Sequence, residues 1–292
     1  MPTIFSKLWV PAAFAFGTQI AAASIFVPLK SEKYYDFLGG TGHIIAAGIS
    51  LYGPTLYQHL AASKPLATYR FPALSTFAPR QLVITAAFGF WAARLAVFLF
   101  HRISKEGKDS RFDQIKQNAP RFFMAWVIQG AWISIVGLPV WLTNAVPGVL
   151  TRPWGRPDVA LLGAAALCLG TEMLADYQKS AWRAEKNQGK HQEKFINRGL
   201  WSLSRHPNYV AEIGLHTCIW GLATRSLYAP GVPGIAVAIA ATSPLFTYYI
   251  LRYLSGVPLL ERAANKKWRD DPNWKHYKQT TPVFWPWARI YD

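Results

Sequence analysis

The chain has 292 residues, of which 51% are hydrophobic and 16% are charged, and its formal net charge is +16 at pH 7. An average soluble domain carries about 25% charged residues, so this composition argues against a soluble protein and for a membrane protein. Nucleic-acid binding, a common reason for a strongly basic chain, is disfavoured because the basic residues are spread over segments between apolar runs.

Seven apolar segments follow one another along the chain. Residues 8–29, 37–63, 122–151 and 226–251 are four stretches of at least 22 residues without a charged side chain. At about 1.5 Å per residue, each stretch is long enough to cross a hydrocarbon core of about 30 Å. Three weaker segments, 81–100, 158–178 and 207–224, interleave with these and contain Arg94, Glu172 with Asp176, and Glu212. We therefore expect an all-α, multi-pass transmembrane bundle of about seven spans.

The distribution of basic residues over the loops predicts the orientation. With seven spans, 23 Lys and Arg residues fall on the side of the carboxyl terminus and seven on the side of the amino terminus. Cytoplasmic loops of membrane proteins carry an excess of Lys and Arg. We therefore expect a cytosolic carboxyl terminus and an amino terminus in the lumen or outside.

The densest polar cluster, residues 199–212, opens directly into the sixth apolar segment. Pro207 suits the first turn of a helix and Ser204 is a plausible cap, so a helix is expected to start here. Ionisable groups at a membrane boundary are costly and usually functional, and free N–H groups of a first helical turn bind phosphate. The competing interpretation, an interfacial cap with an arginine anchor, explains less, because Asn208 and Glu212 are in helical phase.

A second polar cluster lies at the end of the fifth apolar segment. Glu172, Asp176, Lys179 and Arg183 follow one another at steps of four, three and four residues, which places them on one helical face. As structure alone, this face is a ladder of ion pairs worth about 0.2–0.5 kcal/mol for each exposed pair. As a site, it offers a carboxylate for a ribose hydroxyl and cations for phosphates. The residues leave both interpretations open.

Neither the cysteines nor the histidines show the spacing of a metal site. Cys168 and Cys218 both fall inside apolar segments, and the seven histidines are scattered along the chain. Structural zinc sites need closely spaced pairs of such ligands, so no metal is expected.

Several motifs together resemble the steroid 5-alpha-reductase superfamily, and within it an uncharacterised branch of multi-pass proteins with a steroid-reductase-like carboxyl-terminal domain. The motifs are Gly-Leu-Trp-x-x-Ser-Arg-His-Pro-Asn-Tyr-x-x-Glu at 199–212, Ala-Asp-x-Gln-Lys at 175–179, Ser-Gly-Val-Pro-Leu-Leu-Glu at 255–261 and Lys-Asp-Ser-Arg-Phe at 108–112. The resemblance covers about residues 90–290.

The resemblance implies a single membrane domain that reduces a carbon–carbon double bond of a lipophilic substrate, such as a sterol, an enone or an enoyl lipid, with NADPH. Residues 1–100 would supply the substrate side and residues 101–292 the cofactor-binding part, facing the cytosol. The membrane would be the endoplasmic reticulum in a eukaryote or the inner membrane in a bacterium. The cofactor-binding residues implied are Asp176, Asn208 and Glu212, and, as weaker candidates, Arg102, Lys179, Arg183, Arg198, Arg205, His206, Tyr209 and Tyr277.

The substrate side departs from the family pattern. Steroid 5-alpha-reductases polarise the substrate with a Glu and a nearby Tyr in the amino-terminal half, whereas Glu32 lies in a loop here and residues 98–100 are Phe-Leu-Phe where a Tyr is expected. No catalytic residue is therefore assigned. Four residues of the second apolar segment could donate a proton to the substrate, although ordinary core packing is the better interpretation of each. They are His43, Tyr52, Tyr57 and His59.

Two other functions stay open. Membrane methyltransferases that use S-adenosylmethionine, of the isoprenylcysteine or phospholipid type, share the Arg-His-Pro-x-Tyr element of residues 205–209 and an acidic residue before the tail, here Glu261. A non-catalytic protein that binds membrane lipids is the third possibility, because the substrate-side Glu is missing.

Overall fold

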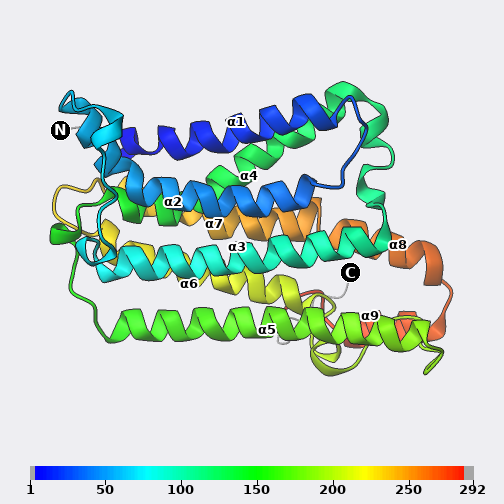
Figure 1. The fold of residues 1–292 in the computed structure, drawn as a ribbon. Helices are drawn as coiled ribbons and strands as arrows, with labels where there is room; N and C mark the ends of the chain where they lie inside the picture. The colour runs from blue at the N-terminus through cyan, green and yellow to red at the C-terminus, as the bar shows by residue number, and fades with distance from the viewer. Residues whose placement is uncertain (1–3, 286–292) are drawn as a thin grey trace. The chain divides into compact units, whose positions relative to one another are not determined.

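A computed structural model of the chain describes residues 4–285. These residues form helices and connecting loops, with no β-strand among them (Figure 1). The α-helices are α1 (Trp9–Phe26), α2 (Tyr35–Ala61), α3 (Pro79–Glu106), α4 (Ala119–Ala145), α5 (Arg156–Asn187), α6 (Pro207–Leu227), α7 (Ile235–Tyr249), α8 (Val257–Trp268) and α9 (Pro272–Thr280). A π-helical turn, Ile250–Leu254, connects α7 to α8.

The helices divide into two compact units. Unit 1 comprises Met1–Asp158 and Ile219–Ser243, and unit 2 comprises Val159–Cys218 and Pro244–Asp292. These boundaries differ from the expected division after residue 100. The single membrane domain, with a substrate side and a cofactor side, stays a prediction.

Each of the seven expected spans coincides with one α-helix, from α1 to α7. Pro230 and Pro233 are expected to break the chain between the sixth and seventh spans, and this is confirmed, because α6 ends at Leu227 and α7 begins at Ile235, within the charge-free run 226–251. Proline lacks the backbone N–H that a helix interior needs, so the turn that contains these prolines separates the two helices.

Five helical segments in the described part of the chain are long and apolar enough to cross a membrane. They are Ile4–Phe26, Pro79–Lys105, Ala119–Ala145, Arg156–Asn187 and Ile235–Trp268. The other two long helices contain more glycine and polar residues, which lowers their mean hydropathy: α2 has five glycines and two histidines, and α6 includes Asn208, Glu212 and Arg225. The chain is thus an all-helical integral membrane protein, while the seven crossings and the side of each terminus stay predictions.

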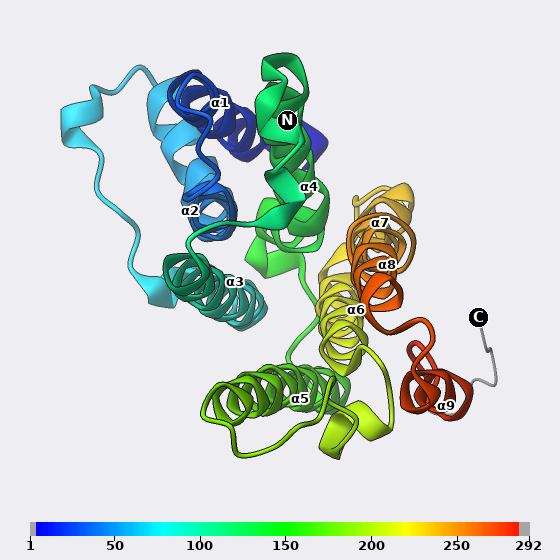
Figure 2. The same ribbon diagram turned by 90° about the vertical axis from the view of Figure 1, so that its right-hand side faces the viewer.

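Unit 1 is built around α2, which packs against α1, α3 and α4. Figure 2 looks along these helices and shows that the connection between α2 and α3 projects away from them. The close approach of α2 to α3 depends on Gly40, because a Cβ there would lie 2.5 Å from Cβ of Ala96. Small residues let membrane helices approach closely, and this contact leaves no room for a methyl group.

Ion pairs hold both ends of unit 1. At one end, Lys116 Nζ lies 2.9 Å from Glu32 Oε2, and Arg111 Nη2 lies 2.6 Å from Asp36 Oδ2. These pairs attach the loop after α3 to the start of α2. At the other end, Arg80 Nε lies 2.8 Å from Asp158 Oδ1, with both side chains buried.

The length of α5 matters for the site. Its 32 residues form one uninterrupted helix (Figure 1) of about 48 Å, against a hydrocarbon core of about 30 Å. The excess leaves room for its charged carboxyl-terminal turns outside the hydrocarbon.

Replacing Gly40 by Ala should destabilise the protein by about 1–3 kcal/mol, because the added methyl group overpacks the contact with Ala96. Gly48→Ala is the matched control in the same helix, since nothing lies within 4 Å of a Cβ there. Thermal unfolding in detergent micelles measures the difference. Equal melting temperatures of the two variants would contradict the close α2–α3 contact.

Candidate functional site

The turn before α6 is held by hydrogen bonds from its side chains and its backbone. Ser204 Oγ accepts from His206 N at 3.2 Å and donates to the carbonyl of Val283 at 3.1 Å. Arg205 N donates to the carbonyl of Pro282 at 2.9 Å. The helix start expected at Pro207 is confirmed, and the same turn also binds the segment that follows α9.

The side chains of this turn converge on one carboxylate of α8. Arg205 Nη1 lies 2.8 Å from Glu261 Oε2, and His206 Nε2 lies 3.1 Å from Glu261 Oε1. Arg205 and His206 are only 3% and 4% exposed. Burial lowers the pKa of His206, while the hydrogen bond to Glu261 acts in the opposite direction. The other ring nitrogen of His206, Nδ1, is buried and has no hydrogen-bond partner in the described part of the chain.

The two polar clusters of the sequence meet between α5 and α6. Asn208 Nδ2 donates to Asp176 Oδ1 at 3.2 Å, and Asp176 is 9% exposed. The ring of Tyr209 stacks on His206, with centroids 5.4 Å apart. Glu212 follows one turn later in α6 and is half-buried.

Gly199 is required where the loop returns to α5. Its φ is +63°, in the left-handed region, and a Cβ there would lie 2.7 Å from Gln178 Oε1. That oxygen accepts a hydrogen bond from Leu200 N at 3.0 Å. The glycine of the first motif thus fits against the glutamine of the second.

A cavity of about 380 Å³ in unit 2 adjoins these contacts, and we call it the basic cavity. Basic and aromatic side chains dominate its lining. The basic ones are Lys179, Arg183, Lys186, Lys194, Arg205 and Lys267, and the aromatic ones are Trp182, Phe195, Trp201, Trp268, Trp274 and Tyr277. Among the lining residues that the structure describes, Glu261 is the one carboxylate, and it already binds Arg205 and His206. The cavity therefore favours an anionic ligand with flat rings.

Aromatic contacts and hydrogen bonds build the wall of the basic cavity. The ring of Phe195 lies 5.0 Å from Trp274 and 5.4 Å from Tyr277. Tyr277 Oη donates to the carbonyl of Trp201 at 2.6 Å, and burial raises the pKa of this phenol. Lys179 Nζ lies 4.4 Å from the centre of the Trp201 ring, within the range of a cation–π contact.

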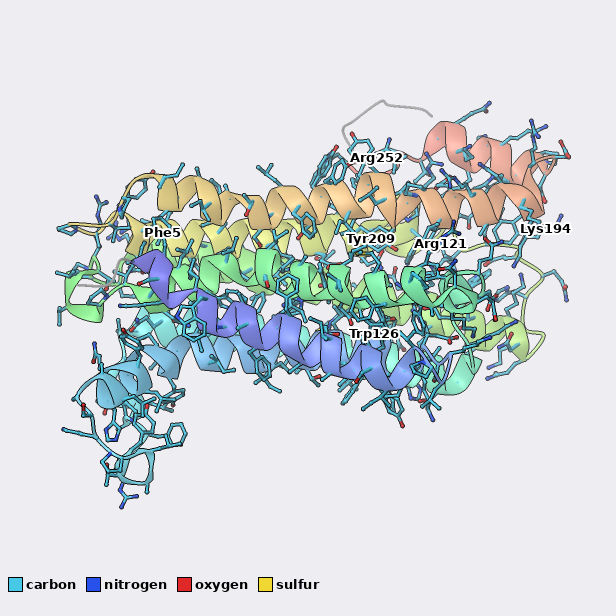
Figure 3. The ribbon with its side chains drawn as sticks, turned by 90° about the horizontal axis from the view of Figure 1, so that it is seen from above. Phe5, Arg121, Trp126, Lys194, Tyr209 and Arg252 are labelled. Atoms are coloured by element: carbon cyan, nitrogen blue, oxygen red, sulfur yellow. The ribbon has the colours of Figure 1, made fainter. Side chains whose placement is uncertain are left out.

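The loop after α5 closes one side of the cavity. Lys194 Nζ lies 2.6 Å from Asp271 Oδ2 at the start of α9, and this contact lowers the pKa of Asp271. Figure 3 shows Lys194 beside the end of α8.

The structure brings some of the expected cofactor-binding residues together and separates others. Five line the basic cavity: Lys179, Arg183, Arg205, His206 and Tyr277. Asp176, Asn208, Tyr209 and Glu212 do not line it. Their roles stay predictions.

Two expected cations have other partners. Arg198 is exposed and lies 2.8 Å from Glu185. Arg102 belongs to unit 1, where it lies 3.4 Å from Asp109 and 3.6 Å from Asp36. Neither lines the basic cavity, since each guanidinium is bound to a nearby carboxylate.

The possible proton donors of the second segment lie in unit 1. His43 is buried against the rings of Phe88, Trp91 and Trp132, as expected for a core residue. His59 Nε2 is 3.0 Å from the carbonyl of Pro65. No catalytic residue follows from these contacts.

Sequence reasoning missed several cavity residues. Lys186 continues the α5 face by one further step of three residues, so the periodicity contained this signal. Lys194, Lys267 and Trp274 come from a loop and from the α8–α9 hairpin, and their place depends on tertiary contacts.

Replacing Glu261 by Gln should reduce the free energy of unfolding by about 3 kcal/mol, because it leaves the buried cation of Arg205 without its carboxylate. Glu185→Gln, which breaks the exposed pair with Arg198, should cost at most about 1 kcal/mol. Chemical unfolding in micelles measures both variants. Similar losses would show that the Glu261 contact does not hold the site.

Comparison with known families gives one match. The model of a family described as "Protein of unknown function (DUF1295)" matches residues 29–281. No curated protein and no solved structure matches the chain. Because the matched residues make up most of its length, the chain belongs to the DUF1295 family.

Proposed function

We propose that the protein is an integral membrane reductase that uses NADPH to reduce a carbon–carbon double bond of a lipophilic substrate, such as a sterol, an enone or an enoyl lipid. The observation that carries the proposal is the basic cavity, in which six cations and six aromatic rings surround a single, already paired carboxylate. NADPH has the matching chemistry, since it carries several phosphate charges and two flat ring systems. The motifs that resemble the steroid 5-alpha-reductase superfamily supply part of this lining.

The residues in and beside the basic cavity have different proposed roles. Lys179 and Arg183, which both line the cavity, would bind phosphate oxygens, Arg183 most strongly because a guanidinium binds in bidentate fashion. His206, which lines the cavity and lies 3.1 Å from Glu261, would hold this carboxylate in place beside a ligand. Asp176 and Asn208, bonded to each other, fix α5 against the start of α6.

When bound, NADPH supplies a hydride, and the protein contributes binding and orientation. Holding the two reactants in place converts a bimolecular step into an effectively unimolecular one. We place this site at the cytosolic face of the endoplasmic reticulum or of a bacterial inner membrane, in accordance with the loop charges.

Asp176→Ala and Asn208→Ala each remove the hydrogen bond that fixes α5, with Lys179 and Arg183, against the start of α6, so each should weaken NADPH binding by about 10-fold by displacing these cations. Isothermal titration of the purified protein measures the affinity. Exposed Asp270→Ala and Asn197→Ala are matched controls that should bind as the unchanged protein does.

Loss of folding must be separated from loss of binding. Asp176→Asn keeps the shape and removes the charge, and the melting temperature of every variant shows whether it is folded. Folded Asp176→Ala and Asn208→Ala variants with unchanged affinity for NADPH would show that this contact does not position the cofactor site.

One contact favours a second candidate, a methyltransferase that uses S-adenosylmethionine. Arg205 and His206 bind Glu261, so the two elements shared with membrane methyltransferases meet in space. The charge of the cavity favours NADPH, because S-adenosylmethionine carries a sulfonium cation that the excess of basic side chains would repel.

The two candidates differ in what Lys179→Gln combined with Arg183→Gln should do. Under the reductase proposal, NADPH raises the melting temperature of the unchanged protein, and the double variant loses most of this shift because two phosphate-binding cations are removed. Lys190→Gln, which removes a charge from an exposed residue outside the cavity, is the control and should keep the full shift. A shift with S-adenosylmethionine alone would support the methyltransferase, and NADPH binding without turnover of any lipid would support a non-catalytic lipid-binding protein.

A further inference from the structure

A second hollow lies on another face of the α8–α9 hairpin, and we call it the basic groove. Its volume is about 550 Å³, and its lining includes Arg262, Lys266, Arg269, Lys275, Lys278 and Trp274. Trp274 is the residue that it shares with the basic cavity among the described lining residues. The groove is thus a separate feature, outside the proposed cofactor site.

The cations of the basic groove form two stripes. Arg262 and Lys266 lie four residues apart on α8, Arg269 follows three residues later as the C-cap of that helix, and Lys275 and Lys278 are three residues apart on α9. Like charges at these spacings repel each other and destabilise a helix. A bound anion removes this cost.

Neighbouring carboxylates offset the charge of the groove only in part, chiefly where Glu261 faces the charge of Lys278. Among its described lining residues none is acidic. Asp271 is bonded to Lys194 at 2.6 Å and to Asn273 N at 2.8 Å, and Glu261 is bonded to Arg205. None of the five cations forms an ion pair with a carboxylate in the described part of the chain, so the groove presents a net positive charge to a ligand.

The position of the groove favours a ligand with an apolar part. Leu259, 38% exposed, lies three residues before Arg262 and so on the same face of α8. The helical segment Ile235–Trp268, which contains α8, is apolar enough to cross a membrane. One face of α8 thus changes from an exposed leucine to three successive cations where this apolar segment ends.

We propose that the basic groove binds the phosphate-bearing headgroup of an anionic phospholipid, with its acyl chains beside Leu259. Each Lys or Arg near an anionic lipid surface strengthens binding by roughly fivefold, so a cluster of five gives preference over a zwitterionic lipid. The proposal does not depend on the cofactor assignment.

Native mass spectrometry of the full-length protein, titrated in micelles with phosphatidylglycerol or phosphatidylcholine, tests this site. The variant Lys266→Gln/Arg269→Gln/Lys275→Gln should bind phosphatidylglycerol about 10- to 100-fold more weakly. Its control, Lys105→Gln/Lys108→Gln/Lys190→Gln, removes the same charge from exposed residues outside the groove and should keep the affinity. NADPH affinity, measured in parallel, should be equal in both variants, which separates this test from that of the cofactor.

Three results would overturn the proposal. Equal affinity of the unchanged protein for the two lipids would show no preference for an anionic headgroup. Equal losses in the groove variant and its control would show an effect of net charge alone. Displacement of phosphatidylglycerol by millimolar glycerol 3-phosphate would show that the groove recognises a soluble phosphate and not a lipid.

Discussion

Unit 2 depends on the contact that holds the charge of Arg205 inside the protein. A buried guanidinium is costly without a carboxylate beside it, and Glu261 supplies that carboxylate at 2.8 Å. The contact joins the turn before α6 to α8, while the backbone of the same turn binds Pro282 and Val283. The start of α6, α8 and the segment after α9 are therefore held together at the wall of the basic cavity.

The electrostatics of the cavity follow from this contact. Glu261 is occupied by Arg205 and His206, so it does not offset the other basic side chains of the lining. The aromatic rings around it resist filling by water and present flat surfaces, whereas the cations attract negative charge. A ligand that combines phosphate groups with planar rings would contact both the cations and the aromatic rings of this lining.

Local signals in the sequence predicted the helices and the start of α6. Charge-free runs mark α1, α2 and α4, and Ser204 with Pro207 marks the helix start, because caps and prolines act within one turn. The helical period also places Asp176 and Asn208 on faces that meet. The absence of charge continues through the turn between α6 and α7, so the two prolines Pro230 and Pro233, and not charge, mark where α7 is separated from α6.

The partners of individual cations could not be predicted from the sequence. Arg102 and Arg198 have the same charge as Arg183 but are bound by Asp109 and Glu185, contacts that depend on how loops fold. The cavity wall formed by α8 and α9 could not be predicted from the sequence either, because it depends on the packing of Phe195 on Trp268 and Trp274. The contacts of Phe195 join segments about 70 to 80 residues apart and leave no periodic pattern.

The aromatic wall has a spectroscopic consequence. Four of the 13 tryptophans, Trp182, Trp201, Trp268 and Trp274, line the one cavity. Their fluorescence is sensitive to polarity and to energy transfer over short distances, and a dihydronicotinamide ring absorbs light in the range where tryptophan emits. Under the proposed function, occupancy of the cavity by NADPH would therefore change the intrinsic emission of the protein, without any attached label.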